Sequence, residues 1–145
     1  MSQLTIYVAG GWVGKEYLLK PMKCLEEHGF IVNSTWIQRE SGNNHPNILS
    51  IDSQKDMEEI TNADIVLAFM ESPNYAYRGT YFEIGYALGQ NKKVIIICPG
   101  KFKLMSKNKC NYDFYCMGLP FFWNENIIRA KTFEESLKIL MSFKD

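Results

Sequence analysis

The sequence predicts an α/β fold: a three-layer sandwich with a mainly parallel, five-stranded sheet. Three observations support this prediction. Short apolar runs alternate along the chain with segments of helical periodicity, the runs carry few polar residues, and 145 residues is the length of one domain. Nearly continuous apolar strands are typical of a parallel sheet that helices cover on both faces. We therefore expect residues 1–145 to form a single domain.

Five strands and four helices are expected. The strands are apolar runs bounded by turn residues: Leu4–Ala9, Phe30–Thr35, Ile65–Phe69, Lys93–Ile97 and a short last strand at Phe121–Trp123. The helices have helical spacing or a capping residue at their start: Glu16–His28, a helix from Asp52 or Ser53 to about Asn62, Thr80–Gln90 and a last helix that Thr132 begins. Residues 39–50 and 71–78 are expected to be loops, and residues 101–119 show no clear period.

Two of these helices begin with the pattern of a capping box, in which a threonine and an acid three residues later bind backbone amides. Thr132 and Glu135 form one such pair, and Thr80 and Glu83 form the other.

Strand and helix in alternation predict parallel strands joined by right-handed crossovers. The expected architecture is therefore flavodoxin-like or Rossmann-like.

Composition excludes several classes of protein. Sixteen basic residues balance sixteen acidic ones, so no overall charge attracts nucleic acid or a membrane surface. No apolar run approaches the ~18 residues of a membrane span. The four cysteines form no C-x-x-C pair and no secretory leader is seen, so we expect reduced thiols in a cytoplasmic protein. The two histidines have no metal-ligand spacing, and no metal site is expected.

The predicted fold indicates which acids can face a ligand. In an open parallel sheet, ligands bind beyond the carboxyl ends of the strands, where the helices begin. Asp56, early in the second helix, and Glu83, at the start of the third, fall on that edge. Asp64 precedes the third strand and falls on the far edge. We expect Asp64 to accept hydrogen bonds from backbone amides in the turn before the strand.

Glu83 has two interpretations. It can be the acid of a capping box, or it can be the group that carries out the chemistry of the protein. The second interpretation is compatible with the same position, because a helix N-terminus favours the ionised carboxylate by ~0.3–1 kcal/mol. Gly79 leaves room for another group near the backbone. A pair of carboxylates suits sugar chemistry, in which one attacks the anomeric carbon and the other moves a proton. The aromatic residues that could stack on a flat ring are Tyr7, Trp12, Trp36, Tyr75 and Tyr77.

Three segments resemble the nucleoside 2-deoxyribosyltransferase family. Thr5–Trp12 (TIYVAGGW) resembles the first strand and base-binding turn of the family. Asp56–Val66 (DMEEITNADIV) resembles its helix and third strand, and Gly79–Ala87 (GTYFEIGYA) resembles its nucleophile segment. Together the three segments span about Thr5 to Ile97, and the last of them is the most specific.

The resemblance implies a mechanism. Glu83 would attack C1′ of the (deoxy)ribose, expel the base and form a glycosyl-enzyme ester, which a second base captures in a transferase and water captures in a hydrolase. Asp56 would orient Glu83 or handle the proton of the leaving base, and Tyr7 would contact the nucleophile or the sugar. The base pocket would be lined by Gly10, Gly11 and Trp12. No metal or organic cofactor is implied.

The resemblance also implies the partners, which are a nucleoside or nucleotide and a free nucleobase. Because a neighbouring subunit completes the sites of the family, a homodimer or larger homo-oligomer is expected. The partner-subunit residue is expected between residues 101 and 111, where Lys103, Ser106 and Asn108 are the candidates.

The chain departs from the family just before the nucleophile segment. Family members often carry an acid or a serine where Tyr77 and Arg78 stand, so we expect the substrate to contact Tyr77, Arg78, Gly79 and Thr80. If Arg78 meets a phosphate, and Lys15 partly replaces an arginine of related enzymes, the protein is instead a nucleoside 5′-monophosphate N-glycosidase. The alternative from another class is a nucleotide-binding sensor module without turnover.

Overall fold

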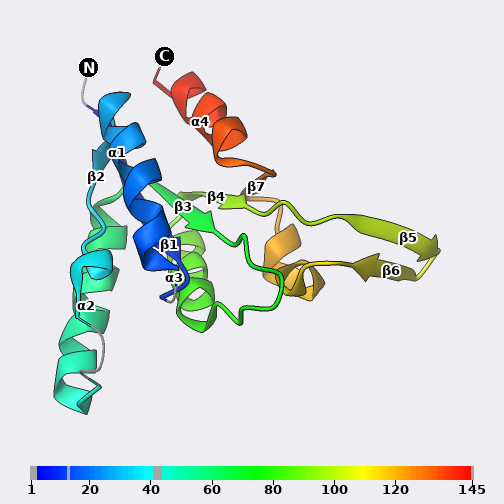
Figure 1. Cartoon of the computed structure of the whole chain (residues 1–145), viewed down its shortest axis with the longest axis horizontal. Coiled ribbons are helices and arrows are strands. Elements are labelled where there is room, and N and C mark those ends of the chain that lie inside the picture. The colour runs from blue at the N-terminus through cyan, green and yellow to red at the C-terminus, as the bar shows by residue number, and fades with distance from the viewer. Residues whose placement is uncertain (1–2, 13, 41–43, 145) are drawn as a thin grey trace.

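A five-stranded, all-parallel sheet runs through the middle of the molecule in the order β2-β1-β3-β4-β7 (Figure 1). The computed structural model describes residues 3–12, 14–40 and 44–144. The strands are β1 (Thr5–Gly10), β2 (Ile31–Val32), β3 (Ile65–Phe69), β4 (Lys93–Ile97) and β7 (Ile127–Ala130). This order is flavodoxin-like, so the predicted fold class is confirmed.

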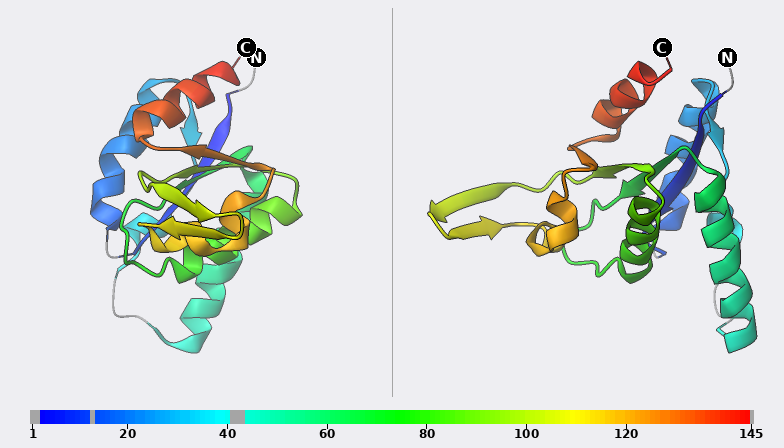
Figure 2. Two further views of the ribbon diagram at one scale, coloured as in Figure 1. Left: turned by 90° about the vertical axis from the view of Figure 1, so that its right-hand side faces the viewer. Right: turned by 180° about the vertical axis from the view of Figure 1, so that it is seen from behind.

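Within the described residues, four α-helices cover the two faces of the sheet (Figure 2). One face carries α1 (Leu19–Glu27), which follows the short 3-10 helix η1 (Lys15–Leu18), and α4 (Phe133–Ser142). The other face carries α2 (Pro46–Asn62) and α3 (Arg78–Gly89). Because the crossovers run from the carboxyl end of one strand back to the start of the next, α2 and α3 both begin at the ligand-binding edge.

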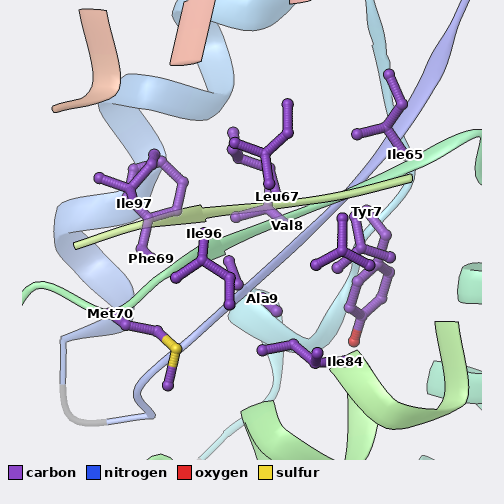
Figure 3. Packing of buried hydrophobic residues seen from close by; sticks show 14 of the residues in the cluster. Tyr7, Val8, Ala9, Ile65, Leu67, Phe69, Met70, Ile84, Ile96 and Ile97 are labelled. Carbon is purple, nitrogen blue, oxygen red and sulfur yellow. The ribbon is translucent and has the colours of Figure 1, made fainter. Parts of the chain in front are cut away.

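The central strands form the core. Every residue of β3 is buried, and β4 is buried from its second residue onward. Figure 3 shows Leu67 projecting to one face of the sheet, while Tyr7 and Ile84 meet on the other, with the tyrosine ring directed at α3. Burying one large aliphatic side chain stabilises the fold by ~1.5–3 kcal/mol. This burial explains why the apolar runs of the sequence form the central strands of the sheet.

A two-stranded antiparallel hairpin projects from the sheet between β4 and β7 (Figures 1 and 2). It consists of β5 (Phe102–Ser106) and β6 (Lys109–Tyr112), and all five residues of β5 are exposed. Two short 3-10 helices follow, η3 (Tyr115–Gly118) and η4 (Pro120–Trp123). The Trp123 ring packs against Phe102 and Tyr112, with centroid distances of 5.4 and 6.2 Å. This packing ties η4 to the base of the hairpin.

The structure corrects two of the predicted strands and adds an element that was not predicted. The aromatic run Phe121–Trp123 belongs to η4, which Pro120 begins, and the fifth strand is β7. The second strand is shorter than Phe30–Thr35. The hairpin was not predicted, since an exposed strand pair needs no apolar alternation.

The start of α2 was also predicted wrongly. The helix begins at Pro46, ahead of the expected Asp52 or Ser53, because a first-turn proline lacks only an amide that would have no helical partner. His45 caps it, since its Nδ1 accepts from the Asn47 amide at 3.1 Å. Residues 41–43 of the predicted loop lie outside the described residues. Elsewhere Thr132 begins the last helix as predicted: its Oγ1 accepts from the Glu135 amide at 3.1 Å, while the Glu135 carboxylate accepts from the Lys131 amide at 2.6 Å.

Candidate active site

A cavity of about 530 Å³ opens between the carboxyl end of β1, the segment after β3, the part of α2 from Ser53 to Ile60 and the beginning of α3. Most of the residues predicted for the site line it: Gly10, Trp12, Asp56, Tyr77, Arg78, Gly79, Thr80 and Glu83. Tyr7 and Gly11 are the exceptions. Tyr7 is fully buried behind the cavity wall, and a Cβ on Gly11 would lie 2.9 Å from the ring of Tyr75, which lines the cavity. The structure therefore places eight of the ten residues predicted for the site around one cavity.

Glu83 does not cap its helix. Tyr77 takes a left-handed backbone conformation (φ 52°), so α3 begins at Arg78 and Glu83 lies in its second turn. Thr80 is not a cap either, because its Oγ1 donates to the carbonyl oxygen of Gly10 at 3.0 Å. The Glu83 carboxylate instead accepts a hydrogen bond from the Tyr7 hydroxyl. The capping-box interpretation of Glu83 is wrong, and the carboxylate is available to the cavity.

Burial raises the pKa of Glu83 to about 7. The hydrogen bond from Tyr7 opposes this shift, the charge of Asp56 adds to it, and the charge of Arg39 opposes it. The expectation that the helix N-terminus keeps Glu83 ionised is therefore also wrong, since desolvation is the largest effect and raises the pKa. Glu83 changes charge close to neutral pH.

Tyr7 is a permanent hydrogen-bond donor to Glu83. Burial raises the pKa of the Tyr7 phenol well above its ordinary value, and the charges of Glu83 and Asp56 raise it further. The hydroxyl therefore keeps its proton at physiological pH. Because the tyrosine ring is held rigidly in the core, its hydroxyl fixes the carboxylate in one place.

Asp56 is paired with an arginine that the sequence-based search did not select. Arg39 Nη2 lies 2.7 Å from Asp56 Oδ1, and Nη1 lies 3.3 Å from Oδ2. Arg39 Nε also lies 3.6 Å from Asp52 Oδ1. Burial lowers the pKa of Arg39, but the hydrogen bond and charge of Asp56 outweigh this and hold it above its usual value. Arg39 follows the second strand, so a search of that edge for bases as well as acids would have found it.

Asp64 lies away from the cavity, as predicted. Its Oδ2 accepts from the Thr5 amide at 2.8 Å, and its own amide donates to the Thr5 carbonyl at the same distance. Asp64 therefore joins the starts of β1 and β3 at the far edge of the sheet.

Lys15 does not line the cavity. Its ammonium donates to the backbone carbonyl of Arg39 and stands 3.8 Å from the centroid of the Trp12 ring. Lys15 therefore braces the turn after β1. The hairpin candidates Lys103, Ser106 and Asn108 do not line the cavity of their own chain either.

Aromatic rings form much of the cavity wall. Trp12 and Trp36 lie with their centroids 6.2 Å apart, and Tyr75 meets Tyr77 edge to face at 4.7 Å. All four residues line the cavity. Apolar walls with a few polar groups are typical of sites for small planar ligands.

In the part of the chain that the structure describes, no group of three His, Cys, Asp or Glu side chains is placed to hold a metal ion. Within the same residues, every helix is too short or too polar to cross a lipid bilayer.

The structure is an α/β domain with a cavity at the carboxyl edge of its parallel sheet. The family model described as nucleoside 2-deoxyribosyltransferase matches residues 6–117. The chain therefore belongs to the nucleoside 2-deoxyribosyltransferase family, whose members are deoxyribosyltransferases or N-glycosidases. No curated protein sequence matches the chain significantly.

Solved structures show the same fold. The CMP N-glycosidase BcmB of Clostridium botulinum is 20% identical over 94% of this chain and 98% of its own, with a TM-score of 0.56. The 2-deoxyribosyltransferase of Leishmania mexicana is 17% identical over 96% and 97% of the two chains, with a TM-score of 0.62. The 2-deoxyribosyltransferase of Bacillus psychrosaccharolyticus is 24% identical over 66% of this chain and 72% of its own, with a TM-score of 0.57.

Proposed function

We propose that the protein is an enzyme that cleaves or exchanges the N-glycosidic bond of (2′-deoxy)nucleosides through a glycosyl ester on Glu83. The observation that carries this proposal is the position of Glu83. Its carboxylate lies in the cavity, accepts a hydrogen bond from buried Tyr7 and shares the cavity with Asp56.

The proposed reaction has two steps. The Glu83 carboxylate attacks C1′, the bond from C1′ to the base nitrogen breaks with its electrons going to the base, and a sugar ester forms. A second base, or water, then attacks C1′ and releases Glu83. Because the pKa of Glu83 is about 7, the attacking form is well populated at and above neutral pH.

Tyr7 and Asp56 support this chemistry. The Tyr7 hydroxyl holds one carboxylate oxygen of Glu83, which leaves the other oxygen for C1′. Asp56 orients Glu83 or handles the proton of the leaving base, from the opposite helix. Trp12 and Tyr75 supply flat surfaces for the base on the cavity wall.

Substitution of Glu83 tests the proposal. Glu83→Gln and Glu83→Ala should abolish base release while the circular dichroism spectrum remains that of the folded protein. Glu58→Gln, on the exposed side of α2, is the matched control and should keep full activity. Near-wild-type turnover by Glu83→Gln would refute the mechanism.

The covalent step has its own measurement. After incubation with a slow 2-fluoro nucleoside analogue, intact mass should show one sugar added to the wild-type chain and none to Glu83→Gln. An unmodified wild-type chain that still releases base would argue for direct attack by water.

A nucleoside 5′-monophosphate N-glycosidase is the second candidate. Arg78 favours it, because this residue lines the cavity and its side chain makes no hydrogen bond or ion pair with the rest of the described chain. Base release from a nucleoside and from its monophosphate should be compared in wild type and in Arg78→Gln. If neither protein distinguishes the two substrates, the monophosphate hypothesis fails.

One screen separates the remaining alternatives. Nucleosides and monophosphates are tested for free base, with and without a second base present, so that transfer and hydrolysis are measured together. Tight binding with no product from any of them would instead support a nucleotide-binding sensor.

We also propose that the protein forms a homo-oligomer with shared sites. The projecting hairpin presents exposed apolar residues, including Leu104 with 72% of its surface exposed, and its candidates do not line the cavity of their own chain. Light scattering should therefore report a dimer or a larger assembly. An active monomer would contradict the proposal.

A further inference from the structure

We propose that Arg39 is a positioning residue of this site: it holds the Asp56 carboxylate in one orientation and offsets the negative charge of Asp56 next to Glu83. The inference rests on the function proposed above and assigns a role to a residue that lies outside the nucleophile segment.

The geometry of the pair is specific. Two guanidinium nitrogens of Arg39 meet the two carboxylate oxygens of Asp56, at 2.7 and 3.3 Å. A two-pronged pair fixes the plane of a carboxylate, which a single hydrogen bond leaves free to rotate. The side chains keep only 18% and 24% of their surface exposed, so water and salt screen the interaction weakly.

Arg39 is itself held in place. Its amide donates to the Trp36 carbonyl at 3.1 Å, and its carbonyl accepts from the Lys15 ammonium, which covers the Trp12 ring. The turn after β1 and the segment after β2 thus hold the backbone of Arg39, while Asp56 of α2 binds its guanidinium. An exposed arginine that merely paired with a nearby acid would lack these supports.

Arg39 also balances the charges around Glu83. The groups that act on the pKa of Glu83 through a charge or a hydrogen bond are Tyr7 from β1, Asp56 and Glu59 from α2, and Arg39. The two acids raise the pKa of Glu83, whereas the Tyr7 hydrogen bond and the Arg39 charge lower it. Among these groups Arg39 is the cation. Without it, Glu83 would need a higher pH to become the attacking carboxylate.

Two substitutions separate charge from orientation. Arg39→Gln removes both, so the acid limb of the kcat/KM profile should move up by about one pH unit and kcat should fall. Arg39→Lys keeps the charge, but a lysine ammonium cannot form the paired hydrogen bonds that a guanidinium makes to both carboxylate oxygens. The acid limb should therefore return to the wild-type pH while kcat stays reduced. Lys55→Gln removes the same charge from α2 outside the cavity and should change neither quantity.

A measurement that needs no turnover accompanies the kinetics. The Cδ signal of Glu83, labelled with ¹³C and assigned by its loss in Glu83→Gln, should titrate about one pH unit higher in Arg39→Gln than in wild type. An unchanged titration in Arg39→Gln, or a wild-type kcat in Arg39→Lys, would overturn the role of Arg39. If wild-type protein turns over no nucleoside or nucleotide, the proposed function fails, while the titration still decides whether Arg39 sets the charge of Glu83.

Discussion

Glu83 should destabilise the fold at the pH at which it is charged. Its pKa rises from an ordinary 4.5 to about 7 in the folded protein, because burial disfavours the carboxylate. Between these two values the native state binds more protons than the unfolded state, so stability falls as the pH rises through this window. At ~1.4 kcal/mol per unit, the full loss above pH 7 is about 3 kcal/mol. Replacing Glu83 with an uncharged side chain should remove it.

Urea unfolding measures this effect. Glu83→Gln keeps the size of the side chain and an acceptor for Tyr7, so at pH 8 it should be more stable than wild type. Between pH 5 and pH 8, its advantage should grow by about 2.5 kcal/mol. Comparing variant with wild type at each pH cancels the other titrating groups. Glu125→Gln, at an exposed position before β7, is the matched control and should show no such growth.

Parallel pH dependences for Glu83→Gln and wild type would refute this reasoning. Glu83 would then titrate at the same pH in the folded and unfolded states, and a desolvated carboxylate could not be the reason for the activity expected near neutral pH.

Three further predictions concern residues around this one. Tyr7→Phe removes the hydroxyl whose hydrogen bond lowers the pKa of Glu83. A hydrogen bond to a charged group contributes ~1.5–3 kcal/mol, so the acid limb of the activity profile should move up by about 1–2 pH units. A profile identical to wild type would contradict this. Asp64→Ala should cost about 1 kcal/mol in urea unfolding and leave kcat/KM unchanged, because its carboxylate only binds backbone at the far edge. Gly100→Ala should destabilise the fold by about 1–3 kcal/mol, because the added Cβ would lie 2.4 Å from Met117 Sδ; an unchanged unfolding midpoint would show that the segment adapts.

Fold elements could be predicted where burial constrains the sequence. The third and fourth strands were predicted at the residues that β3 and β4 occupy, since both are apolar almost throughout. The first turns of α2 were missed because Ile60 is the buried residue of this helix, and an exposed helix needs no apolar period. The hairpin was missed for the same reason, as all of β5 faces solvent.

The candidate site was predictable in position but not in its contacts. The edge of the sheet follows from strand direction, and it selected Glu83 and Asp56 while excluding Asp64. Arg39 was missed because the search of that edge selected acids and left out bases, and its partner Asp56 lies 17 residues away on another element. Nothing local to Arg39 indicates that pairing.

The sequence alone determined the layered α/β fold and the edge of the sheet at which each acid lies. The physical reason is that each crossover helix must run antiparallel to the parallel strands that it connects. Only the tertiary structure decided that Glu83 accepts a hydrogen bond from Tyr7 and does not cap its helix. It also decided that Arg39 pairs with Asp56 and that the pKa of Glu83 is about 7. These properties depend on desolvation and on charges brought together from distant parts of the chain. They therefore do not exist until the sheet and its helices have packed.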